Sequence, residues 1–105
     1  MRGPEPALRL LGLAARAGAV EVGTERVREA VRRGRVRLVI VAGDASANSK
    51  AKVVPLVEAR GVPYVEVFDR ARLGEAVGRG AMSAVGVTDA EFAKRIRELL
   101  RAENG

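Results

Sequence analysis

Two short segments of the chain hold residue types that bind phosphates and nucleobases. The first begins with Gly23-Thr24 at the expected start of a helix and continues with mixed basic and acidic residues. Unpaired backbone N–H groups at a helix start bind phosphate, and arginine donates paired hydrogen bonds to a phosphate or to a guanine edge. The candidate binding residues of this segment are Gly23, Thr24, Glu25, Arg26, Arg28, Glu29, Arg32 and Arg33.

The second segment, Arg79-Gly80-Ala81-Met82-Ser83, precedes the last expected strand. Its small residues permit a close approach to the backbone, and Ala81 or Met82 can pack on an unstacked base, as RNA loops and bulges present. Taken alone, the segment is more typical of an ordinary turn whose methionine fills the core. It becomes a candidate because a basic helix accompanies it.

Groups for catalysis are sparse. The chain has neither histidine nor cysteine, which excludes Ser–His and Cys–His catalysis, thiolate zinc sites and disulfides. Asp44 follows an apolar strand, where open α/β sheets place functional groups, so a small enzyme using Asp44 or Lys50 is one hypothesis. A lone aspartate there is more often a helix cap or a turn residue. We therefore expect a protein that is not an enzyme and has no catalytic residues, no metal and no cofactor.

The positive charge is concentrated in one region. The net charge is +6, and residues 23–37 carry six arginines and two glutamates, a net +4. A surface that binds phosphate has this kind of distribution, although a solvated helix face has it too. The chain has only three aromatic residues, which argues against binding of single strands by base stacking.

The hydrophobic pattern predicts alternating helices and strands. The expected helices cover residues 8–17, 24–33, a segment ending at Gly61, 70–77 and a last one after Thr88 or Asp89; the expected strands are 20–22, 36–42, 62–68 and 82–87. The first helix is apolar around most of its circumference, so it should be largely buried. Thr24 and Asp69 are candidate helix caps. Pro55 should kink the third helix or delay its start.

The alternation favours one α/β domain over residues 1–105, a three-layer α/β/α sandwich with a mostly parallel or mixed sheet. Residues 1–6 and 102–105 are expected to fray. The stripe Phe92, Ile96, Leu99 and Leu100 should face the core. There is no apolar run long enough for a membrane span and no signal-peptide pattern, so we expect a cytoplasmic protein without a membrane partner.

A series of short motifs through residues 8–97 has the order and spacing of one known family. These motifs are Leu11-Gly12-Leu13-Ala14-Ala15-Arg16-Ala17-Gly18, Gly23-Thr24, Leu38-Val39-Ile40-Val41-Ala42, Asp44-Ala45-Ser46, Val62-Pro63-Tyr64, Leu73-Gly74-Glu75-Ala76-Val77-Gly78 and Val85-Gly86-Val87-Thr88-Asp89. The chain resembles the kink-turn-binding ribosomal-protein family, the L-seven-Ae and L-thirty-e type, and within it the small bacterial YlxQ-type members. The resemblance implies an α/β/α sandwich with a four-stranded mixed sheet. It also implies a non-catalytic, ribosome-associated protein that binds structured RNA.

The resemblance assigns roles to the two candidate segments. In the family, residues after a helix-opening Gly-Thr read sheared G·A pairs, commonly through an Asn-Glu pair, and a basic residue one turn further supports them. Gly23 and Thr24 match the opening. By position the Asn-Glu pair falls on Glu25 and Arg26, and the usual lysine falls on Glu29, which reverses the charge.

Other arginines stand close to these departures. Arg28, Arg32 and Arg33 can restore phosphate contacts from another angle, and residues 79–83 correspond to the apolar loop that covers a flipped-out base in the family. The partner that this implies is a ribosomal or kink-turn RNA, bound by a monomer. Because the reading residues differ from the family's, a protein-interaction module with only non-specific RNA affinity is the alternative.

Overall fold

The computed structural model describes residues 5–104, and in these the elements alternate as the sequence predicts. They are α1 (Pro6–Arg16), β1 (Val20–Val22), α2 (Thr24–Arg32), β2 (Leu38–Val41), α3 (Ala47–Ala59), β3 (Tyr64–Glu66), α4 (Arg70–Ala76), β4 (Ala84–Val87) and α5 (Ala90–Asn104).

The four strands form one mixed sheet in the order β1-β4-β2-β3. β4 is antiparallel to both β1 and β2, whereas β2 and β3 are parallel. The carboxyl ends of β1, β2 and β3 and the amino end of β4 therefore meet at the same end of the sheet. We call it the Gly23 end, and it carries residues 23–24, 43–46, 67–69 and 79–83.

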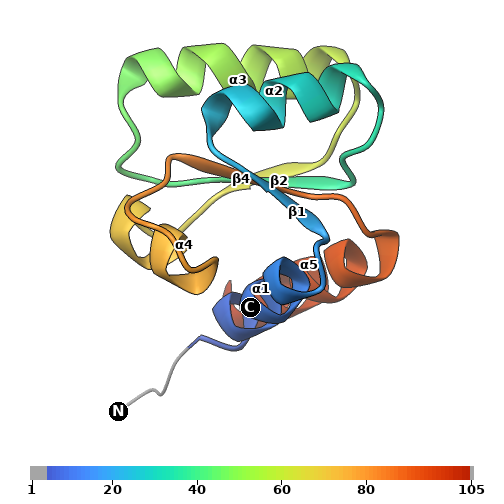
Figure 1. Cartoon of the computed structure of the whole chain (residues 1–105), viewed down its shortest axis with the longest axis vertical. Helices are drawn as coiled ribbons and strands as arrows, with labels where there is room; N and C mark the ends of the chain where they lie inside the picture. The colour runs from blue at the N-terminus through green and yellow to red at the C-terminus, as the bar shows by residue number, and fades with distance from the viewer. Residues whose placement is uncertain (1–4, 105) are drawn as a thin grey trace.

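Helices cover both faces of this sheet (Figure 1). The helices α2 and α3 pack together on one face, where α2 also contacts β1 and β4. On the other face α1 packs against α4 and α5, and both α4 and α5 contact β4. The predicted three-layer α/β/α sandwich with a four-stranded mixed sheet is confirmed.

The core lies between the layers and consists of aliphatic side chains. All four residues of β2 and all four of β4 are buried, as a strand covered on both faces must be. Ile96 and Leu100 of the predicted α5 stripe are buried, and Phe92 and Leu99 pack against the core. The interpretation of that stripe as core is confirmed.

One side of α1 departs from the prediction. Leu11 and Ala14 are fully buried, but the side chain of Leu13 is 51% exposed. Leu13 lies on the side of α1 that faces a groove beside Ala76 of α4. The expectation that α1 is buried around most of its circumference is therefore wrong on this side.

Pro55 lies inside α3 and neither delays nor interrupts the helix. The start is fixed by Ser46, whose hydroxyl accepts a hydrogen bond from the Ser49 N–H at 3.0 Å. Proline has no N–H, so the Ala51 carbonyl lacks the helical hydrogen bond that residue 55 would donate. Ala51 and Pro55 are both exposed, so water can reach this carbonyl. The expected later start is thus wrong.

The ends of several elements also differ from the expected ones. The three later strands are shorter than expected, because their outer residues bond to loops rather than to the ladder; for example, the Arg37 N–H donates to the Val87 carbonyl at 2.8 Å. Asp69 caps α4 as predicted, and Asp89 rather than Thr88 caps α5. The helices α1 and α5 extend to Pro6 and Asn104, into the segments expected to fray. Residues 1–4 and 105 lie outside the described residues.

Candidate nucleic-acid interface

The sheet brings the two candidate segments side by side. Val22 pairs with Val85 across the antiparallel β1 and β4, so β1 leads into α2 beside the start of β4. The Gly23 N–H donates a hydrogen bond to the Ala84 carbonyl at 3.0 Å. Residues that are almost sixty positions apart in the sequence thus form one surface at the Gly23 end.

The start of α2 is open to an anion. Gly23 is the N-cap residue, with φ of 99°, a left-handed conformation that favours glycine. Thr24 is the first helical residue, so the prediction that Thr24 caps the helix is wrong. Because glycine has no side chain to accept a hydrogen bond, the first N–H groups of α2 remain available to a phosphate or a base acceptor.

The loop of residues 79–83 is held against α4 by a glycine–glycine contact. A Cβ added to Gly74 would lie 1.8 Å from the carbonyl oxygen of Gly80, so only glycine fits at position 74. The Arg79 N–H donates to the Gly74 carbonyl at 2.8 Å, and the Met82 N–H donates to the Arg70 carbonyl at 3.0 Å. The backbone of the loop is therefore fixed on the α4 side.

The tip of this loop faces solvent. Arg79, Gly80 and Ala81 are exposed, and Met82 and Ser83 are partly exposed. The side chain of Met82 is partly exposed, so the interpretation that it fills the core does not describe this loop. The exposed small residues leave room for a base to approach the loop, as the family resemblance requires.

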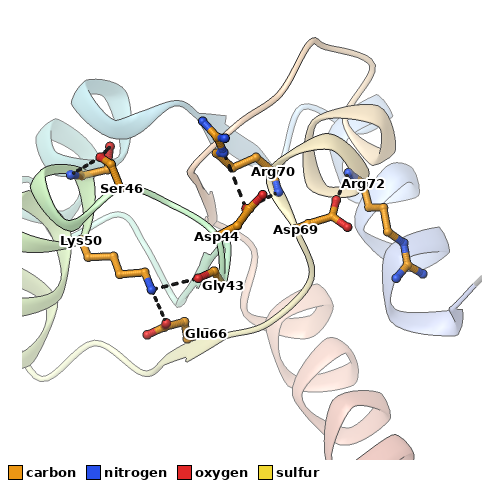
Figure 2. Close-up of polar contacts among 9 residues, drawn as sticks. Gly43, Asp44, Ser46, Lys50, Glu66, Asp69, Arg70 and Arg72 are labelled. Carbon is orange, nitrogen blue, oxygen red and sulfur yellow. Dashed lines mark hydrogen bonds and ion pairs between the residues drawn. The ribbon is translucent and has the colours of Figure 1, made fainter.

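Asp44 and Lys50, the two candidates for an enzyme, have structural partners (Figure 2). The Asp44 carboxylate accepts a hydrogen bond from the Arg70 N–H at 2.8 Å and forms an ion pair with its guanidinium at 3.6 Å. The Lys50 ammonium donates to the Gly43 carbonyl at 2.9 Å and to the Glu66 carboxylate at 2.6 Å. Both side chains thus tie neighbouring loops of the Gly23 end together.

The Asp44–Arg70 contact continues into the candidate loop. Asp44 binds the amide of Arg70, and the carbonyl of Arg70 accepts the hydrogen bond from Met82. The Ala42 N–H also donates to the Ser83 carbonyl at 2.9 Å. The loops after β2 and before β4 are thereby joined in one hydrogen-bonded network.

Glu25, at the position of the family's asparagine, lies between two cations. Its carboxylate is 4.0 Å from the Nε of Arg28 and 3.7 Å from the ammonium of Lys52 on α3. The Arg28 Nε is buried and makes no hydrogen bond to any described residue. Lys52 was not among the sequence candidates, because only the packing of α3 against α2 brings it here.

The remaining acidic residue of α2 is also paired. The Glu29 carboxylate accepts a hydrogen bond from the Arg33 Nε at 2.7 Å. By contrast, Arg26 is exposed, and no carboxylate of the described residues lies within 4.0 Å of its guanidinium. Arg26 is therefore the arginine of the first helical turn that is free to contact a ligand.

The candidate residues of α2 do not all lie together. A helix rises about 1.5 Å per residue, so the nine residues of α2 span about 13 Å. Gly23 lies beside residues 79–83 through its hydrogen bond to Ala84. Glu25 and Arg28 lie toward Lys52 of α3, and Arg26 lines a groove that also contains Glu29 and Arg33. Glu29 lies further along the helix, and Arg32 and Arg33 lie at its far end. The sequence-predicted site is therefore split in two by the length of α2.

The described residues also bear on metal binding and on membrane insertion. Among the described residues, no group of three or more acidic side chains is placed to hold a metal ion. In the same part of the chain, no helix is both long and apolar enough to cross a membrane.

Comparison with known proteins identifies the family. Residues 6–97 match the Ribosomal protein L7Ae/L30e/S12e/Gadd45 family. The chain belongs to this family. It is 42% identical over 91 residues to the "RNA-binding protein YlxQ" of Bacillus subtilis (strain 168), a match that covers 87% of this chain and 91% of that protein. It is 35% identical over 86 residues to the "Large ribosomal subunit protein eL8" of Thermoplasma volcanium, covering 81% of this chain and 71% of that one.

Solved structures agree with this family membership. A protein of unknown function from Bacillus halodurans C superposes with a TM-score of 0.89 at 37% identity, covering 93% of this chain and 99% of that one. A Giardia lamblia 15.5kD RNA binding protein superposes with a TM-score of 0.74 at 25% identity, covering 88% and 85%. The similarity to solved members of the same architecture thus extends over most of the described fold.

Proposed function

We propose that this protein binds structured RNA without catalysis, as a ribosome-associated protein, and that the Gly23 end of its sheet recognises a kink-turn-like element. The single observation that carries the proposal is the hydrogen bond between Gly23 and Ala84, which joins the open start of α2 to the loop of residues 79–83. The relatives that are named as RNA-binding or ribosomal proteins support the choice of RNA.

The arrangement can bind RNA in two ways at once. The free N–H groups at the start of α2 donate hydrogen bonds to a phosphate oxygen or a base acceptor, and the Arg26 guanidinium donates to a neighbouring phosphate or guanine edge. The exposed Gly80 and Ala81 allow an unstacked base to approach the loop backbone, and Met82 packs against its face. Both contacts need a distorted RNA rather than a regular duplex.

The departures from the family pattern have a physical role in this proposal. Glu25 does not repel phosphate strongly, because Arg28 and Lys52 balance its charge. A carboxylate accepts hydrogen bonds from the N–H donors of guanine, so Glu25 contributes to the recognition of a guanine in the G·A pairs. Arg26 takes the place of the family's glutamate and supplies donors instead of acceptors.

A paired binding experiment tests the function. Binding of a kink-turn RNA is compared with binding of the same RNA in which the G·A pairs are replaced by Watson–Crick pairs, over a series of salt concentrations. The proposal predicts tighter binding of the intact kink-turn at every salt concentration. Equal affinity for both RNAs leaves only charge-driven binding and refutes recognition at the Gly23 end. Absence of binding to either RNA at low salt favours a protein-interaction module.

A further inference from the structure

Five exposed arginines belong to segments at the end of the sheet opposite the Gly23 end, and these segments lie on the right of Figure 1. They come from the end of α2, from the segment that leads into β2 and from the end of α3. We call this group the far arginine patch; it consists of Arg32, Arg33, Arg35, Arg37 and Arg60.

Backbone contacts fix the positions of these arginines. The Arg60 guanidinium donates to the Arg32 carbonyl at 3.0 Å, which joins the ends of α3 and α2. The Arg35 N–H donates to the Ala30 carbonyl at 3.0 Å, and the Arg37 N–H donates to Val87 at 2.8 Å. The patch is thus part of the folded framework rather than a loose basic segment.

Most of these cations have no acidic partner. Arg33 pairs with Glu29, but no carboxylate of the described residues lies within 4.0 Å of the guanidinium groups of the other four. Glu21, Glu29 and also Arg26 line the groove that contains Arg33 and Arg35. Counting both glutamates, five positive and two negative charges leave the patch at +3. At the Gly23 end, in contrast, carboxylates pair with Arg28, Lys50, Lys52 and Arg70.

Helix stability accounts for only part of the patch. Cations near a helix carboxyl end interact favourably with its dipole, which explains Arg32, Arg33 and the capping contact of Arg60. Arg35 and Arg37 lie beyond that helix end and gain nothing from it. Clustered unpaired cations repel one another, and a polyanion relieves this repulsion when it binds.

We propose that the far arginine patch binds the sugar-phosphate backbone of a double-helical RNA segment outside the element recognised at the Gly23 end. This inference rests on the proposed function in that the ligand is RNA. The arginines of the patch bind phosphates, and on an A-form double helix they cannot read guanine edges, because the major groove is too deep and narrow for side chains. The patch therefore adds affinity that depends on salt and not on sequence. Because α2 spans about 13 Å between the two surfaces, an RNA bound at the Gly23 end reaches the patch through a flanking stem.

The test uses two RNAs and two matched double variants. One RNA contains the kink-turn with short flanking stems, and the other extends each stem by about one helical turn. The patch variant is Arg35→Gln/Arg37→Gln. The control variant is Arg95→Gln/Arg97→Gln on α5, which removes the same charge from exposed arginines on the other layer. Circular dichroism and thermal unfolding verify that both variants fold.

The expected result is a loss of salt dependence on the extended RNA. The slope of log K against log salt concentration is negative, and each lost phosphate contact makes it shallower by about 0.7–0.9. The slope of the patch variant is therefore shallower than that of the wild type by about 1.4–1.8, whereas the slope of the control variant is unchanged. The affinity of the patch variant for the extended RNA falls, whereas the preference of this variant for intact over G·A-replaced RNA is unchanged. Equal slopes for the patch and control variants on the extended RNA overturn the proposal. If recognition at the Gly23 end fails instead, the G·A preference is absent from the wild type while the difference in slope remains.

Discussion

The contact between Gly74 and Gly80 allows a sharp test of how α4 positions the loop before β4. In Gly74→Ala, the added Cβ lies 1.8 Å from the Gly80 carbonyl oxygen and 2.6 Å from its carbonyl carbon. Both atoms belong to the backbone, so no side-chain rotation relieves the clash. Reaching 3.0 Å, the shortest distance that real Cβ contacts show, requires a movement of 1.2 Å (3.0 − 1.8).

Two opposing effects set the size of the change in stability. Alanine is favoured over glycine inside a helix by about 1 kcal/mol, which alone predicts a more stable protein. Overpacking costs about 1–3 kcal/mol, and a clash with rigid backbone belongs in the upper part of that range. The expected net loss in free energy of unfolding is about 1–2 kcal/mol. For a chain of this size, each 1 kcal/mol lowers the midpoint of thermal unfolding by about 4–8 °C.

The assay combines urea unfolding with RNA binding. Gly74→Ala should unfold at a lower urea concentration and bind kink-turn RNA with less preference over the G·A-replaced RNA, because the loop is displaced by more than the roughly 0.5 Å that a binding site tolerates. Gly80→Ala is the matched control for the urea unfolding, since a Cβ there meets no protein atom within 4 Å; it is not a control for RNA binding, because Gly80 lies in the candidate loop. A Gly74→Ala protein that is as stable as the wild type and keeps its RNA preference refutes the reasoning.

Three further predictions concern the arginines of α2, the contact of Asp44 with the start of α4, and the contact between Tyr64 and Glu58. Arg26→Ala should weaken binding to intact kink-turn RNA more than binding to the G·A-replaced RNA. Arg32→Ala should mainly reduce the dependence of the affinity on salt concentration. If both variants lose the preference for intact RNA to the same extent, the division of roles along α2 is contradicted. Asp44→Ala should lower the free energy of unfolding by about 1 kcal/mol, because the amide at the start of α4 loses its acceptor, and Asp44→Asn, which keeps an acceptor, should lose less in urea unfolding. The hydrogen bond that Tyr64 donates to the Glu58 carboxylate raises the pKa of the tyrosine above 10.0, so its contribution to stability is complete below pH 10 and is lost as the hydroxyl ionises. Glu58→Ala should shift the phenolate absorbance midpoint of this single tyrosine to lower pH, and an unchanged midpoint would contradict the contact.

The sequence predicts what depends on local pattern and misses what depends on packing. Apolar periodicity placed every helix and strand, and Asp69 capped its helix as expected. The chain gives no local signal that Lys52 reaches Glu25, because the two residues meet only when α3 packs against α2. The close approach of Gly74 and Gly80 has no signal beyond two glycines in a segment that is rich in them. Such contacts follow from the tertiary fold and not from spacing.

The split of the basic segment shows why a charge count along the chain misleads. Residues 23–37 carry a net +4, and a linear window assigns that charge to one site. In the fold, Glu25 offsets Arg28 at the start of α2 and leaves Arg26 as the unpaired arginine there, whereas the far arginine patch lies at the other end of the helix, about 13 Å away. A surface that distinguishes base pairs needs fixed geometry more than net charge, and a surface that only holds phosphates needs charge more than geometry. The helix separates these two requirements, so variants at its two ends should change specificity and affinity independently.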